Sequence, residues 1–147
     1  MDGEPITLKN GTNWRNPDSF PVKSISRLIA LMAIQLDGPC PGILASVTDN
    51  RGDYVLSDAL WKCSPSAEVG WSELGYDDST WAAARLIRIN DNTNDTQCQD
   101  YFDEIASISS DAYWIWTNNP NGQDVVAFCR GYLRKYISPG IGLEPIL

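Results

Sequence analysis

The sequence contains no histidine. This absence excludes Ser-His-Asp and Cys-His catalysis, histidine general bases and histidine-ligated zinc. No two cysteines form a CxxC pair, so the spacing of a zinc ribbon or a thioredoxin-type site is missing. Glycine-rich phosphate loops and GxSxG elbows are also absent. No apolar run reaches the roughly 18 residues of a membrane-spanning helix, and we therefore expect no membrane insertion.

Positive charge is also scarce. The chain has 147 residues, with 11 Lys and Arg against 19 Asp and Glu, which gives a formal net charge of −8. Nucleic-acid binding draws on clustered cationic side chains, so this balance argues against a nucleic-acid partner. The length suits one domain, and 43% hydrophobic residues suffice for a buried core. We expect a soluble, acidic, single globular domain.

The four cysteines are Cys40, Cys63, Cys98 and Cys129. Their even number and wide spacing favour two disulfides over the alternative of four reduced, buried thiols. Four cysteines allow three pairings. We favour Cys63–Cys129, because both residues lie in apolar, strand-like segments. Cys40 and Cys98, both in loops rich in Pro, Asn and Asp, are then left as the second pair.

Two N-glycosylation sequons begin at Asn10 and Asn94. Together with the disulfides they indicate an extracellular, secreted protein, although such triplets also arise by chance in Asn-rich loops. The residues from Met1 onward form no apolar signal sequence. If the protein is secreted, we expect the chain to be a trimmed part of a longer precursor.

Short apolar segments separated by turns predict an antiparallel β-sandwich. Residues 1–23 are expected to form an irregular arm, residues 24–139 the sandwich domain, and residues 140–147 a C-terminal tail. Turns are expected at 49–53, 77–81 and 118–122, and a loop at 90–100. Residues 82–89 fit either a helix or a strand. Strands are expected within the segments 24–36, 42–47, 54–56, 58–63, 112–116 and 125–133.

Four segments resemble motifs of one family, the galactose-binding-like domains. The segment 70–81 (GWSELGYDDSTW) resembles their W…(F/Y)DDSxW signature, and 112–116 (AYWIW) resembles the strand that follows it. Residues 128–130 (FCR) resemble their closing strand, and 58–63 (DALWKC) resembles a motif of an invertebrate subset. The resemblance spans roughly residues 24–134. It implies an all-β jelly-roll sandwich, found in extracellular proteins and as an accessory module of glycoside hydrolases.

Asp77 and Asp78 within this signature have two interpretations. As structural residues they accept backbone N–H groups at a turn, and Trp81 then closes one end of the sandwich. As functional residues they bind calcium or a sugar. Arg130, on the last expected strand, is expected to pair with one of these carboxylates rather than with a ligand.

The resemblance also implies that a ligand binds in loops at one end of the sandwich, and that a structural calcium is possible although no cofactor is required. The loops rich in oxygen donors supply the candidate ligand-binding residues, since calcium prefers carboxylate and amide oxygens. Residues 51–53 also form an Arg-Gly-Asp triplet, which occurs in adhesion proteins. The candidate residues are Asp49, Asn50, Asp53, Asn92 and Asn94.

Six tryptophans are present. Alternation along the strand places Trp114 and Trp116 on one face, and we expect this face to be the core, with Trp61, Trp71 and Trp81 packing beside it. An exposed platform that stacks on a sugar ring is the alternative. Trp14, in the arm, is expected to clamp the arm to the body, and is also the candidate aromatic residue for ligand binding.

These features predict a non-catalytic binding module. The neighbouring carboxylates of Asp77 and Asp78 do not resemble the separated pair of a glycosidase. Carbohydrate binding of the lectin type is our first hypothesis, with a sugar as the partner. The alternative is a domain for protein–protein interaction, adhesion or surface-coat assembly that binds an extracellular protein and no sugar, since fold analogy alone does not separate the two.

Overall fold

A computed structural model of the chain describes residues 1–23, 26–36, 38–48, 54–91, 98, 102–119, 121 and 124–133. These residues form an all-β structure without helices, and thus contain no helix that could cross a membrane. The strands are β1 (Leu28–Ile34), β2 (Ser46–Thr48), β3 (Tyr54–Leu56), β4 (Lys62–Ser64), β5 (Ala82–Ala83), β6 (Arg85–Ile89), β7 (Tyr113–Trp116) and β8 (Val126–Tyr132).

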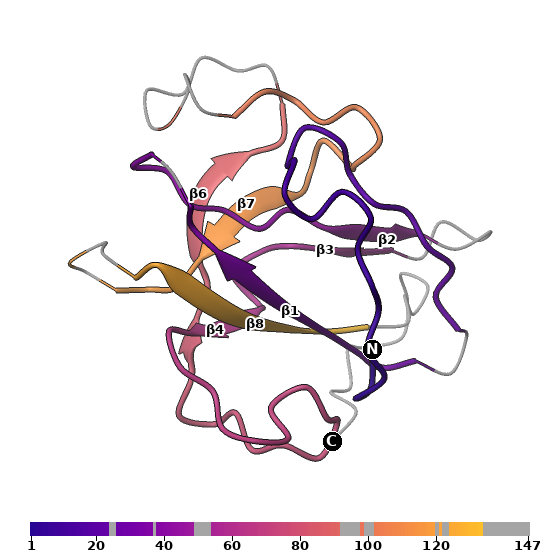
Figure 1. Ribbon diagram of the computed structural model, residues 1–147, viewed down its shortest axis with the longest axis vertical. Coiled ribbons are helices and arrows are strands. Elements are labelled where there is room, and N and C mark those ends of the chain that lie inside the picture. The colour runs from indigo at the N-terminus through magenta and orange to yellow at the C-terminus, as the bar shows by residue number, and fades with distance from the viewer. Residues whose placement is uncertain are drawn as a thin grey trace, which may run out of the picture.

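The strands form three antiparallel sheets (Figure 1). The largest sheet has the order β1-β8-β4-β5, and the others pair β2 with β3 and β6 with β7. An isolated bridge between Ile43 and Ile115 connects the segment before β2 to β7. The all-β class and the antiparallel pairing that we predicted are confirmed, and the arrangement is compatible with a β-sandwich.

Both predicted disulfides are present. Cys63 on β4 lies directly opposite Cys129 on β8, with 4.2 Å between their Cα atoms. Cys40 is bonded to Cys98, which joins two loops 58 positions apart in the chain. Disulfides of this kind persist in oxidising compartments, so the pairing is consistent with an extracellular protein.

The main core lies on one face of the four-stranded sheet. Alternate residues of β1 and β8, such as Ile29 and Ala127, pack with Ile115 and Trp116 of β7. Trp61 belongs to the same cluster and fills the space above Gly131. A Cβ atom at Gly131 would lie 2.2 Å from the Trp61 indole, so only glycine fits there.

A second, smaller core contains Phe102, Ile105 and Trp114. Trp114 and Trp116 are both buried, as predicted, but the expectation of one shared core was wrong, because Trp114 packs in this second cluster. The segment 102–111 folds over β6 and β7 and covers Trp114. A register shift in β6 between Leu86 and Arg88 accompanies this arrangement.

Every predicted strand segment contains a strand, two of them with shifted bounds, and the open choice at residues 82–89 is decided. Near the segment 42–47 the regular strand is Ser46–Thr48, which begins later than predicted and ends one residue beyond it. The segment 58–63 begins with a turn, because the Asp58 carboxylate accepts the Leu60 N–H at 2.8 Å. Residues 82–89 form β5 and β6, which excludes the helical alternative.

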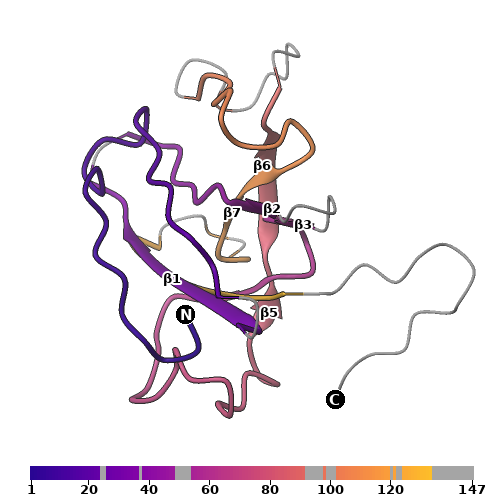
Figure 2. The ribbon, with the colours of Figure 1, turned by 90° about the vertical axis from the view of Figure 1, so that its right-hand side faces the viewer.

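Residues 1–23 run as an irregular arm along one side of the molecule, from the start of β1 toward segment 102–111 (Figure 2). Asp2 fixes the first part of the arm, because its carboxylate accepts the N–H groups of Arg27 and Leu28. The predicted turn at 49–53, most of the loop at 90–100 and the tail at 140–147 lie outside the described residues.

Candidate functional site

The segment 65–81 connects β4 to β5 and lies against the face of the four-stranded sheet opposite the core. Asp77 and Asp78 in this segment both make hydrogen bonds with the nearby backbone. Asp77 is exposed, and its carboxylate accepts the Ser79 N–H at 2.9 Å, which closes a turn. Trp81 donates its backbone N–H to the carbonyl of Asp78, so the chain turns directly back into β5. The predicted turn at 77–81 is confirmed.

Arg130 on β8 fixes the segment 65–81 to the sheet through hydrogen bonds. Its side chain has an exposed fraction of 0%, because it lies between the sheet and the segment. The guanidinium Nε donates to the Asp78 carboxylate at 2.8 Å, and Nη1 donates to the carbonyls of Trp71 and Glu73. Nη2 donates to the Tyr132 hydroxyl at 3.0 Å. One buried cation thus satisfies carbonyls that no strand pairs, as backbone groups removed from water require.

Asp78 receives hydrogen bonds from three side chains. Besides Arg130, these come from the Lys62 ammonium at 3.0 Å and from the Tyr132 hydroxyl at 2.9 Å. Burial raises the pKa of Asp78, but the hydrogen bonds from Arg130, Lys62 and Tyr132 outweigh it, so the pKa lies below its ordinary value. The predicted pairing of Arg130 with one of the aspartates is confirmed.

These contacts define what Asp77 and Asp78 can bind. A calcium ion at Asp78 would have to displace the positive charges of Arg130 and Lys62, which already occupy both carboxylate oxygens. The backbone N–H of Ser79 lowers the pKa of Asp77, which stays ionised as a turn residue. Among the described residues, no three His, Cys, Asp or Glu side chains gather where they could hold a metal ion.

Aromatic rings cover the same face of the sheet. Trp71 stacks on Trp81 with 6.4 Å between ring centroids, and its edge contacts Phe128 of β8 at 5.1 Å. Tyr76 meets Trp81 edge-on at 5.7 Å. Trp71 and Trp81 are half-buried, so the expectation that they pack in the main core was wrong. The physical reason is strand alternation, which points Phe128 away from the core that Ala127 and Cys129 enter.

A pocket of about 340 Å³ opens beside Trp81. Its walls come from three segments, 63–65, 80–82 and 117–119, together with Asp124. The pocket combines one indole with hydroxyl, amide and carboxylate groups. This mixture of an apolar surface and a few polar groups is typical of small-molecule sites.

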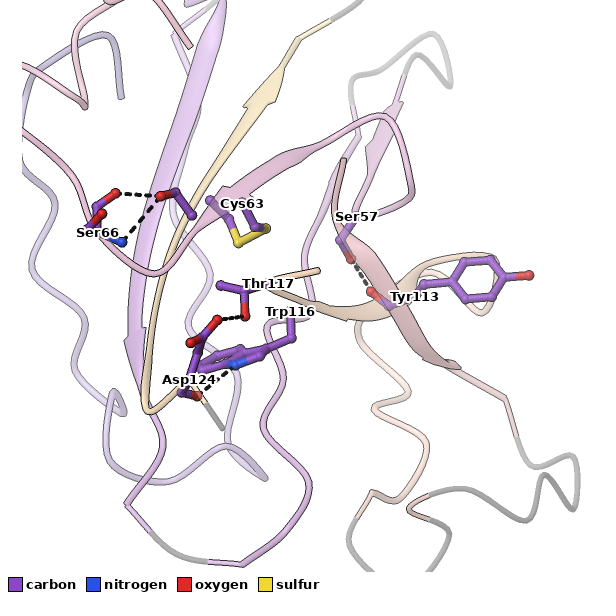
Figure 3. Close-up of a disulfide and its surroundings, with 9 residues drawn as sticks. Ser57, Cys63, Ser66, Tyr113, Trp116, Thr117 and Asp124 are labelled. Carbon is purple, nitrogen blue, oxygen red and sulfur yellow. Dashed lines mark hydrogen bonds between the residues drawn. A yellow bond between two sulfur atoms is a disulfide. The ribbon is translucent and has the colours of Figure 1, made fainter. Parts of the chain in front are cut away.

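Asp124 is the one acidic residue among the described residues of the pocket wall, and neighbouring side chains orient its carboxylate. Oδ2 accepts the Thr117 hydroxyl at 2.7 Å, and Oδ1 accepts the Asn119 amide at 2.8 Å. Its backbone carbonyl accepts the Trp116 indole N–H at 3.0 Å. Figure 3 shows Asp124 beside Trp116 and Thr117, with dashed lines for the hydrogen bonds to both. The carboxylate is therefore held in one position at the pocket.

The candidate loop residues Asp49, Asn50, Asp53, Asn92 and Asn94 lie outside the described residues, as does the Arg-Gly-Asp triplet.

Trp14 in the arm is not among the residues that line the pocket. It meets Phe102 and Trp114 in edge-to-face contacts, with ring centroids 5.9 and 5.8 Å apart. Arg15 covers its ring, with the guanidinium carbon 4.2 Å from the centroid. These contacts make Trp14 a clamp of the arm, as predicted.

The sequon residue Asn10 is half-buried in a turn of the arm. Its backbone N–H donates to the Asp18 carboxylate at 3.0 Å, and its amide donates to the same group at 3.5 Å. Glycosylation there would need the amide to leave Asp18.

Sequence reasoning missed the pocket. We interpreted residues 118–122 only as a hairpin turn, although three asparagines in this segment were a signal of oxygen and amide donors. No sequence pattern identified Asp124 as a pocket residue, because Asp124 and Trp81 come together only in the folded chain. The pocket unites lining residues between 63 and 82 with others between 117 and 124, and these two parts of the chain are 35 positions apart.

Searches against protein-family models, curated proteins and solved structures find no match to this chain.

Proposed function

We propose that this chain is an extracellular, non-catalytic carbohydrate-binding module of the galactose-binding-like jelly-roll type. Its ligand is a sugar bound in the pocket beside Trp81. The single observation that carries this proposal is the placement of an indole next to a fixed carboxylate and two amides in one concave site. The fold name rests on the resemblance of residues 70–81 together with the antiparallel all-β architecture.

The chemistry of the pocket matches that of a sugar. A pyranose presents an apolar C–H face, which packs on an indole, and a rim of hydroxyl groups, which need donors and acceptors. Trp81 supplies the apolar surface, and its position is fixed by the stack with Trp71. Asp124 supplies an oriented acceptor, and Asn118 at the exposed rim supplies an amide. Charge-assisted hydrogen bonds to a carboxylate are stronger than neutral ones.

A binding role fits the pocket better than glycoside hydrolysis. Glycosidases place two carboxylates on either side of the scissile bond, about 5–9.5 Å apart. Asp124 is the one carboxylate in the described wall of this pocket. Asp78 on the neighbouring segment is already paired with Arg130 and Lys62 and is turned toward the sheet.

The test is a glycan array probed with the wild type and with two single variants. We expect Asn118→Ala to lose most of the signal, because it removes an amide at the rim of the pocket. Asn118 is exposed, so we expect this variant to keep its fold. Trp14→Ala is the matched control for a general loss of an aromatic residue and should keep the signal. Absence of any glycan signal, or a loss confined to Trp14→Ala, contradicts the proposal.

Calcium is part of the same experiment. We propose a structural calcium only for the loops around residues 49–53 and 90–95, where the sequence supplies hard oxygen ligands. Binding at the pocket should persist in a chelator, because Thr117 and Asn119 orient the Asp124 carboxylate. Sugar binding that is abolished by the chelator would move the site to those loops.

A further inference from the structure

The strand β1 forms one edge of the four-stranded sheet, and half of its backbone groups face away from β8. Gln35 donates its N–H to Val125, and Leu133 donates its N–H to Arg27, so the odd-numbered residues of β1 bond to β8. The even-numbered residues therefore point to the outside. Leu28 is an example: its N–H and C=O face away from β8 and are both bonded to Asp2 of the arm.

Beyond Leu28 this edge is open. No hydrogen bond within the described residues reaches the outward N–H and C=O groups of Ala30, Met32 and Ile34. The side chains at these positions share the outer face of the sheet. Met32 has an exposed fraction of 54% and Ile34 of 55%, and Leu36 beyond the strand is exposed at 74%. An open strand edge and an apolar strip thus coincide.

Proteins usually protect such an edge. Common protections are a lysine or proline on the edge strand, a bulge, or a covering loop. The residues from Leu28 to Leu36 contain no charge and no proline, and β1 pairs with β8 without a register shift. Among the described residues, Leu28 is the one position from 28 to 34 whose outward N–H and C=O are bonded, both to Asp2.

We propose that β1 pairs with β1 of a second copy of this chain, antiparallel about a two-fold axis at Met32. In this register Ala30 lies opposite Ile34 of the other copy, and Met32 lies opposite Met32. Each outward N–H and C=O then finds a partner, and the two sheets become one continuous sheet. Asp2 limits the pairing to the part of the strand from Ala30 to Ile34.

Self-complementarity identifies the occupant as a second copy. In a two-fold interface the same patch of both copies meets itself. In this register the facing residues Ala30, Met32 and Ile34 are all apolar. The chain as a whole carries −8, so two copies repel each other elsewhere. This uncharged strip is a place where they can approach without opposing like charges. This association is independent of sugar binding at the pocket.

Sedimentation equilibrium over a range of protein concentrations tests the proposal with three variants. Met32→Pro removes only an outward N–H, so the bonds to β8 persist. Met32→Lys places two positive charges opposite each other across the two-fold axis. Leu60→Lys is the matched control, because Leu60 is an exposed apolar residue, at 59%, away from this edge. We expect dimers for the wild type and Leu60→Lys, and monomers for both Met32 variants.

Cysteine cross-linking tests the register. All four native cysteines are in disulfides, so one introduced thiol can be followed alone. Met32→Cys should form an intermolecular disulfide, since directly opposite residues in a hydrogen-bonded pair have Cα atoms about 5.5 Å apart, within disulfide range. Ile34→Cys should not, because its two copies lie four residues, or about 14 Å, apart along the strands.

A wild type that stays monomeric at every concentration overturns the proposal. A dimer that survives both Met32 variants, or that dissociates with Leu60→Lys alone, overturns it as well. A dimer cross-linked more efficiently through Ile34→Cys than through Met32→Cys contradicts the register. Circular dichroism of each variant distinguishes dissociation from unfolding.

Discussion

Two loop segments cover the sheets at opposite ends of the molecule, and they are fixed by different chemistry (Figure 1). The segment 65–81 is fixed by a buried ion pair, in which Arg130 and Lys62 meet Asp78. The segment 102–111 is fixed by the neutral side-chain amide of Asn90 and by the buried Arg88 guanidinium, which donates to the Phe102 carbonyl at 3.1 Å. Asn90 is exposed at 1%, its Nδ2 donates to the carbonyls of Ile105, Ile108 and Ser109, and its Oδ1 accepts the Ile105 N–H at 2.8 Å.

The difference relates to what each segment carries. The segment 65–81 presents Trp81 to the pocket, so its ion pair fixes a proposed binding residue. The segment 102–111 presents Phe102 to Trp14, so Asn90 and Arg88 together fix the contact that clamps the arm. A buried ion pair responds to pH, whereas a neutral amide does not. Loss of Asp78 and loss of Asn90 should therefore differ in their effect on the pH dependence of stability.

The largest effect is expected for Arg130→Met. This variant leaves Asp78 and two backbone carbonyls without their buried donor. Removing one partner of a buried ion pair costs about 3–5 kcal/mol of unfolding free energy, measured by urea denaturation. Lys62→Met is the control, because Lys62 is partly exposed. A loss for Arg130→Met as small as that of a surface pair, below about 1 kcal/mol, contradicts a buried anchor.

Asn90→Ala should cost less, about 1–3 kcal/mol, because the groups it leaves unpaired are neutral. The carbonyl of Ile105 and its N–H lose their partner together. Urea denaturation gives the magnitude, and proteolysis of segment 102–111 reports where the structure loosens. Loosening of segment 65–81 instead would show that the two ends are not separate units.

Acidification should weaken the ion pair that fixes the segment 65–81. The pKa of Asp78 in the folded state lies below the unfolded value of about 3.9. Its stabilisation is complete above that pH and is lost as the pH falls through the lower folded-state pKa. Asp78→Asn should therefore have a flatter pH dependence of unfolding free energy than the wild type. Asn90→Ala should retain the wild-type slope, and an equally flattened slope would contradict this assignment.

Trp14→Ala should have the smallest effect, about 0.5–1.5 kcal/mol, since Trp14 makes two edge-on ring contacts and remains 37% exposed. Faster proteolysis within residues 1–23, with the rest of the chain protected, is the expected local result. Equal protection of the arm in the wild type and the variant would show that the Asp2 contacts alone hold it.

Features encoded by short patterns were predictable from the sequence. The strand near 28–34 was predicted from a continuous apolar run with strand-like neighbouring segments, and the strand near 126–132 from its own apolar segment. The two cysteines within apolar strands paired as expected. The pairing of Arg130 with an aspartate followed from the residue types in the signature. These predictions depend on neighbours in the sequence or on a strong chemical preference.

Features created by packing were not predictable. The alternation that places Trp116 in the core does not reveal that segment 102–111 takes Trp114 into a second cluster. The pocket depends on Asp124 meeting residues near Trp81, which no local pattern encodes. The open edge of β1 could not be predicted, because it depends on the order of strands in the sheet. An apolar run is equally typical of a strand at the centre of a sheet.

The most direct test of the central claim is NMR of the tryptophan indole N–H groups during titration with galactose, fucose and other monosaccharides. Trp81→Phe and Trp14→Phe assign the two relevant resonances among the six tryptophans. We predict that the Trp81 resonance shifts with at least one sugar while the Trp14 resonance stays unchanged. A shift of Trp14 alone, or no shift of any indole with any sugar, would contradict a sugar site held in place by the ion pair of Asp78 and Arg130.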